Sequence, residues 1–175
     1  MHSDRSRPQQ PFPACLPPVH ATTATTAPPP LLLGEEAVLL QSILLALTVT
    51  RTPTQTVVLL KSILLFSHTH VHVAIVADSH RTFELAIEAS TYGWSADACA
   101  RFSFSRHRLY YPPGTEFMRH LNRPCSSSRH FFPEYFAGTR YMLNLDTDVV
   151  LLAPIEELWA HFHRFGARPK VNRVC

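Results

Sequence analysis

Two aspartates, Asp146 and Asp148, are the residues of this chain whose types and spacing best suit chemistry. Apolar residues lie on both sides of them, and burying unpaired carboxylates is costly, so the pair should surface at a strand end or hold a cation. Side chains at i and i+2 at the end of a strand point the same way. That arrangement suits a hard divalent ion with oxygen ligands, of the kind that also carries substrate phosphates. The alternative is a structural turn.

The chain before this pair alternates apolar runs with amphipathic stretches, which predicts an α/β fold. Near-continuous apolar runs rich in β-branched residues are typical of buried strands. Short links join a strand, a helix and a second strand into a βαβ unit, so the sheet is expected to be mostly parallel. Strands are expected at residues 43–50, 71–77, 101–111 and 141–145, and helices at 53–67, 79–90, 116–121, 124–136 (interrupted at Pro133) and 154–165.

The predicted sheet places the aspartate pair at the edge where open α/β sheets bind ligands. Three further residues are candidates for ligand contacts near this pair. Arg129 could hold a phosphate or a sugar hydroxyl by charge-assisted hydrogen bonds; a solvated helix arginine is the alternative. Thr48 and Thr50 end the first strand and could touch a base or phosphate, although a plain strand terminus is the commoner case.

The glycine content limits how a phosphate could be bound. The chain has five glycines and contains neither a GxGxxG nor a GxxxxGK[ST] segment. Without a glycine-rich loop to cradle it, a phosphate would have to be held by a metal.

Composition places the chain among globular proteins of one domain. It has 175 residues, of which 46% are hydrophobic and 17% charged, with a net charge of +3. No dense Lys/Arg run or aromatic-interleaved basic motif is present, so nucleic-acid binding is not indicated.

The cysteines and histidines do not indicate a zinc site. The four cysteines are scattered without a CxxC pair, so neither a zinc site nor a disulfide framework is predicted. A single disulfide is still possible if the chain enters a secretory compartment, and the sequence does not say which pair of cysteines would form it. The closely spaced histidines lack the ligand spacing of zinc sites: His68, His70, His72, His161 and His163.

The two ends of the chain differ in composition from its centre. Residues 1–36 are rich in Pro, Thr and Ala, which predicts disorder, and they lack the apolar core of a signal peptide. Residues 37–49 are apolar but shorter than the roughly 20 residues of a spanning helix, so a buried segment is favoured over a membrane anchor. The predicted domain covers residues 37–166, and a short basic tail covers 167–175.

Four segments together resemble glycosyltransferase family 8, and more narrowly the glucoside xylosyltransferases that extend O-linked glucose on epidermal-growth-factor-like repeats. The segment YMLNLDTDVVLLAPIEELW at residues 141–159 is similar to the family's DxD segment. Residues 57–67, 71–78 and 123–133 agree with the family in order and spacing. The resemblance covers roughly residues 44–166.

The resemblance implies a partial GT-A fold, that is, an incomplete Rossmann-like nucleotide-binding domain. It also implies retaining transfer of a sugar, xylose in the closest group, from a UDP-sugar to a glycan acceptor with Mn²⁺. By position, Asp146 and Asp148 would bind Mn²⁺, with Asp146 and Arg129 near the donor sugar or phosphates. Such proteins are typically type II membrane proteins of the ER or Golgi.

The family's catalytic domain continues past the helix that follows the DxD segment. A late His–Gly–Lys segment supplies the third metal ligand and a phosphate-binding lysine in the family. We therefore expect a nucleotide-binding N-terminal half. The alternative is a non-catalytic remnant that only packs or binds a partner.

Overall fold

The computed structural model describes Cys15 and residues 43–49, 53–121 and 124–165. The expectations for residues 1–36, apart from Cys15, and for residues 167–175 lie outside the described residues. Thr50 lies outside them as well.

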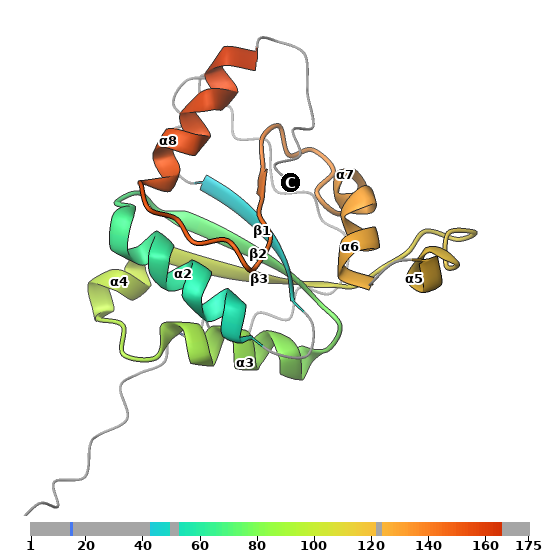
Figure 1. The fold of residues 1–175 in the computed structure, drawn as a ribbon, viewed down its shortest axis with the longest axis horizontal. Helices are drawn as coiled ribbons and strands as arrows, with labels where there is room; N and C mark the ends of the chain where they lie inside the picture. The colour runs from blue at the N-terminus through green and yellow to red at the C-terminus, as the bar shows by residue number, and fades with distance from the viewer. Residues whose placement is uncertain (1–14, 16–42, 50–52, 122–123, 166–175) are drawn as a thin grey trace, which may run out of the picture.

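A four-stranded parallel sheet forms the centre of the fold (Figure 1). Its strands are β1 (Ile43–Val49), β2 (Val71–Ala77), β3 (Phe102–Arg108) and β4 (Leu143–Asn144), in the order β3-β2-β1-β4. All three pairings are parallel, which confirms the predicted α/β class and the architecture of a partial Rossmann-like GT-A fold. Because β1 is a strand, it is not part of a membrane helix. Within the described residues, no helix is long and apolar enough to cross a membrane.

Two helices complete the βαβ repeats on one face of the sheet. Helix α2 (Thr54–Phe66) joins β1 to β2, and α3 (His80–Thr91) begins where the Ser79 hydroxyl accepts a hydrogen bond from the Thr82 N–H. Both helices were predicted within a residue or two of these bounds. A short helix that was not predicted, α4 (Ala96–Ala100), leads into β3.

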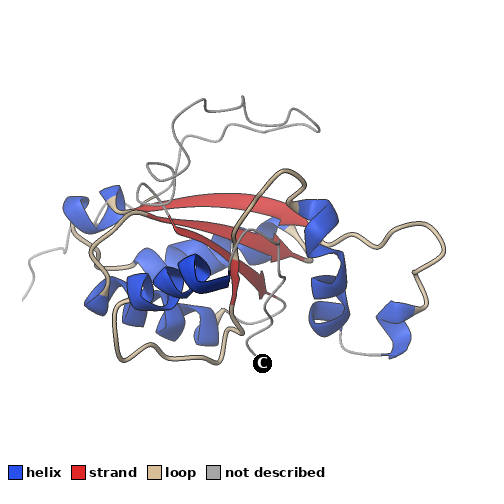
Figure 2. Cartoon of the chain, turned by 90° about the horizontal axis from the view of Figure 1, so that it is seen from above, coloured by secondary structure: helices blue, strands red, loops and turns tan. Residues whose placement is uncertain are grey.

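The main core lies between the sheet and these helices. Alternate strand residues such as Leu45, Leu47, Val73 and Ile75 are fully buried there, as expected for one face of a pleated sheet. Figure 2 shows a loop-and-helix arm extending away from the twisted sheet, whose helix Figure 1 labels α5 (Met118–Leu121).

Two of the predicted helices are interrupted, and one predicted strand is shorter than expected. Residues 124–136 form α6 (Pro124–Ser128), a 3-10 turn (Arg129–Phe131) and α7 (Phe132–Tyr135), with Pro133 tolerated in the first turn of α7. The helix expected at 154–165 is α8 (Ile155–Ala160) followed by a 3-10 turn, His161–Phe165. Strand β4 keeps two of the five residues expected, because only Leu143 and Asn144 pair with β1.

A disulfide joins Cys15 to Cys99 of α4, with their Cα atoms 5.4 Å apart. The two residues are 84 positions apart, which is why the sequence left the pairing open. The bond fixes a point near the N-terminus against the helical layer.

Candidate functional site

The Asp-Thr-Asp segment forms a turn just beyond the carboxyl end of β4. Thr147 and Asp148 lie in this turn, and the Val149 N–H donates to the Asp146 carbonyl oxygen over 3.3 Å. The strand ends at Asn144, so the side-chain alternation of a strand does not extend through the pair. The two carboxylates accordingly have different neighbours.

Asp146 is paired with Arg129 through both of its carboxylate oxygens. Nη1 of Arg129 donates to Oδ2 over 3.1 Å, and Nη2 donates to Oδ1. The side chains are 28% and 39% exposed, so this ion pair adds little to stability but fixes the orientation of both groups. The structure thus brings together two predicted site residues that are 17 positions apart.

Aromatic packing places Arg129 over the second face of the sheet. Phe132, three residues later, is buried against Ala46 and Val76 on that face. The ring of Phe131 meets Tyr111 edge-on, with 5.7 Å between centroids. These contacts hold the 3-10 turn that carries Arg129 close to the carboxyl end of β4.

Asp148 lies on the other side of the turn, beside the start of α2. It is exposed and lines a depression of about 180 Å³ together with Thr54, Gln55 and Val58. Pro53 is the N-cap of α2 and makes no side-chain cap hydrogen bond. A carboxylate near a helix N-terminus is favoured by the helix dipole.

The segment after the turn is anchored along α2 by two buried serines. The Ser62 hydroxyl accepts from the Leu151 N–H and the Ser67 hydroxyl accepts from the Ile155 N–H, each over 3.0 Å. Both serines are nearly inaccessible to solvent. These hydrogen bonds therefore fix the segment that follows the Asp-Thr-Asp turn against the βαβ unit formed by β1, α2 and β2.

Glu156 of α8 provides a third anchor. Its Oε1 accepts from the backbone N–H groups of His68 and Thr69, over 2.7 and 2.8 Å, and from the Thr69 hydroxyl over 3.0 Å. Burial acts to raise the pKa of Glu156, but hydrogen bonds from Thr69, His68 and its own backbone outweigh it, so the pKa is lowered. The carboxylate is thus held ionised where the chain enters β2.

Thr48, near the end of β1, carries a buried hydroxyl with no hydrogen-bond partner among the described residues. Sequence reasoning missed a second such group, the Oδ1 of Asn144. Asn144 is in register with Ala46, so it lies on the same sheet face as Thr48. A polar side chain inside an otherwise apolar strand was the signal available for Asn144.

The histidines of β2 and β3 form hydrogen bonds with serine hydroxyls. His72 contacts the hydroxyls of Ser103 and Ser105 over 2.8 and 2.9 Å, and Ser105 contacts Nε2 of His107 over 3.1 Å. Burial lowers the pKa of both histidines, with the charges of His107 and His70 adding to the effect on His72. Among the described residues, no three His, Cys, Asp or Glu side chains gather as a metal site.

The donor chemistry of the turn fits a hard divalent cation. Asp146 and Asp148 offer carboxylate oxygens, the ligands that Mg²⁺ and Mn²⁺ prefer. A carboxylate has about four acceptor positions, so the bidentate bond to Arg129 leaves Asp146 with capacity for a further contact.

These features define a class of domain: a parallel Rossmann-like sheet with acidic, basic and hydroxyl groups at the carboxyl ends of β1 and β4. No family model matches the chain. It is 33% identical over 116 residues to glucoside xylosyltransferase 1 of Rattus norvegicus, covering 65% of this chain and 25% of that protein.

Other glucoside xylosyltransferases match the chain as well. Glucoside xylosyltransferase 2 of Xenopus laevis is 31% identical over 115 residues, and glucoside xylosyltransferase 1 of Homo sapiens is 25% identical over 116 residues. These matches cover 64% and 65% of this chain and 26% and 25% of those proteins. They confirm the resemblance expected from the sequence. The chain spans about a quarter of the length of the curated relatives it matches.

Proposed function

We propose that residues 37–166 are the nucleotide-sugar-binding part of a retaining glycosyltransferase, with UDP-xylose as donor and an O-linked glucose or related glycan as acceptor. The similarity to glucoside xylosyltransferases carries this proposal. The position of the Asp-Thr-Asp turn supports it, because parallel α/β sheets bind nucleotides at the carboxyl ends of their strands.

The residues around the turn would share the binding of the donor. Asp146 and Asp148 hold Mn²⁺, and Arg129 contacts the phosphates or the donor sugar. Thr48 and Thr50 contact the nucleotide. When bound, Mn²⁺ supplies positive charge that stabilises the departing diphosphate. Arg129 would contribute a second positive charge and keeps the Asp146 carboxylate oriented.

This proposal implies a luminal location in the ER or Golgi. It includes anchoring as a type II membrane protein, and epidermal-growth-factor-like repeats as carriers of the acceptor glycan. The Cys15–Cys99 disulfide supports a secretory location, because such bonds persist in oxidising compartments and are rare in reducing ones.

Calorimetric titration of UDP into the full chain, with and without Mn²⁺, tests the proposal. We expect Mn²⁺-dependent binding that Asp146→Asn combined with Asp148→Asn abolishes. Asp97→Asn is the matched control, because Asp97 is an exposed aspartate on α4. Binding that is absent, independent of Mn²⁺, or unaffected by the double substitution would favour the alternative of a non-catalytic packing or binding module.

A further inference from the structure

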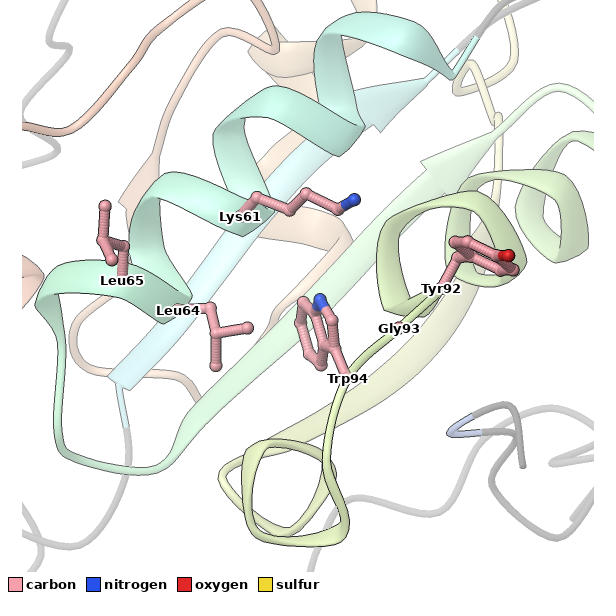
Figure 3. Close-up of a pocket in the computed structure, with 6 residues that line it drawn as sticks. All are labelled: Lys61, Leu64, Leu65, Tyr92, Gly93 and Trp94. Carbon is pink, nitrogen blue, oxygen red and sulfur yellow. The ribbon is translucent and has the colours of Figure 1, made fainter. Parts of the chain in front are cut away.

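A depression between α2 and the end of α3 lies apart from the candidate site. Its volume is about 380 Å³, and six residues line it: Lys61, Leu64, Leu65, Tyr92, Gly93 and Trp94 (Figure 3). It shares no lining residue with the depression beside the Asp-Thr-Asp turn, which is lined by the first residues of α2. The depression is therefore a separate feature of the helical layer.

Trp94 contributes a buried donor without an acceptor. Its side chain is 5% exposed, and its ring packs against Phe102 with 4.7 Å between centroids. The indole Nε1–H is buried and has no hydrogen-bond partner among the described residues. Since most buried polar groups are paired, an unpaired indole N–H calls for an explanation.

Lys61 contributes a cation on the same side of the depression. Figure 3 shows the indole nitrogen on the edge of Trp94 that faces the Lys61 side chain. Within the described residues, the ion pairs are His80–Glu84 and Arg129–Asp146, so Lys61 has no acidic partner there. A lysine ammonium and an indole N–H are both donors only, so the group that complements both is an anionic acceptor.

The rim of the depression is apolar and exposed. Leu65 and Tyr92 are 71% and 72% exposed. Lys61 and Leu65 share one side of α2 because they are four residues apart. Exposed apolar residues grouped around polar anchors are typical of protein interaction sites, where tyrosine is enriched. A small ligand here would leave this rim in water, whereas a polypeptide covers it.

We propose that this depression binds an acidic side chain carried on an apolar segment of a partner polypeptide. The carboxylate accepts hydrogen bonds from the Trp94 indole and the Lys61 ammonium. The long Lys61 side chain moves to admit it, and apolar neighbours in the partner cover Leu65 and Tyr92.

Nuclear magnetic resonance of the indole N–H groups tests this directly. The chain has two tryptophans, so the signal of Trp159 is an internal reference. Trp94→Phe assigns the Trp94 signal, and its contacts to the Phe102 ring assign it independently if that variant does not fold. The probe is the peptide acetyl-Ser-Leu-Glu-Leu-Ser-amide, and its Gln counterpart is the matched control.

We expect a saturable downfield shift of the Trp94 indole proton with the Glu peptide, and binding weakened about tenfold by Lys61→Met or by the Gln peptide. Arg108→Met, which removes an exposed cation from β3, leaves binding unchanged. Equal binding of both peptides, no effect of Lys61→Met, or no saturable shift at millimolar peptide overturns the proposal. A Trp94 shift that depends on protein concentration without peptide would also overturn it, because the occupant would then be a second copy of the chain.

Discussion

Replacing Glu156 tests whether its carboxylate fixes the segment after the Asp-Thr-Asp turn against the sheet. One oxygen of Glu156 accepts three hydrogen bonds, two of them from backbone N–H groups. A charged acceptor contributes about 1.5–3 kcal/mol per bond. The three donors share one oxygen atom and are exposed or only partly buried, so water replaces much of what is lost and the net cost corresponds to about one such bond. We therefore expect Glu156→Ala to lower the free energy of unfolding by about 2 kcal/mol, and Glu156→Gln, which keeps an acceptor, by about 1 kcal/mol.

The effect has a defined dependence on pH. Because the pKa of Glu156 is lowered from its ordinary value of 4.5, its contribution is fully present above pH 4.5. The contribution is lost as pH falls through the folded-state pKa, where the carboxylate becomes protonated.

Urea unfolding of the parent and Glu156→Gln chains at a series of pH values measures the difference. We expect a gap of about 1 kcal/mol at pH 7 that narrows as pH falls below 4.5 through the folded-state pKa. Glu157→Gln is the matched control, because Glu157 is exposed on the same helix. Equal stabilities at pH 7, or a gap that does not narrow as the carboxylate is titrated below pH 4.5, would refute the reasoning.

Three other outcomes are expected. Arg129→Met removes the bidentate partner of Asp146 and should weaken Mn²⁺–UDP binding about tenfold in the same calorimetric titration, without a large change in unfolding; unchanged affinity would exclude a role in donor binding. Cys99→Ser should abolish the cross-linked peptide that contains Cys15 in a non-reducing digest, and mass spectrometry of the parent should show that peptide. Because burial lowers the pKa of His72 from 6.5, the free energy of unfolding should fall as pH drops below 6.5 towards the folded-state pKa. In urea unfolding at a series of pH values, His72→Gln should make the free energy of unfolding depend less steeply on pH. An unchanged pH dependence would exclude His72 as one of its sources.

The sheet could be predicted from sequence because local patterns determine it. Apart from Thr48 and His72, the runs at residues 43–49 and 71–77 are apolar on both faces, which is typical of strands buried in a parallel sheet. The length of β4 could not be predicted, because only Leu143 and Asn144 find partners on β1, and pairing depends on a strand about 100 positions earlier.

The candidate site was predicted residue by residue but not as an arrangement. The types and spacing of Asp146 and Asp148 indicated an acidic site, yet the turn that separates their neighbours follows from tertiary anchoring by Ser62 and Ser67. The pairing of Arg129 with Asp146 depends on aromatic residues packing over the second sheet face. Side-chain contacts between distant segments leave no periodic signal in a sequence.

The two buried serines that bind the segment after the turn, Ser62 of α2 and Ser67 at its C-cap, have a consequence for the dynamics of the chain. Leu151 and Ile155 donate their N–H groups to Ser62 and Ser67, although Leu151 lies outside regular secondary structure and Ile155 is the first residue of α8. Amide hydrogens of loops and first helical turns usually exchange quickly with water, whereas these two can exchange only when the segment separates from α2. The segment that follows both aspartates therefore opens by separating from α2, and the exchange of these two amide hydrogens measures that opening.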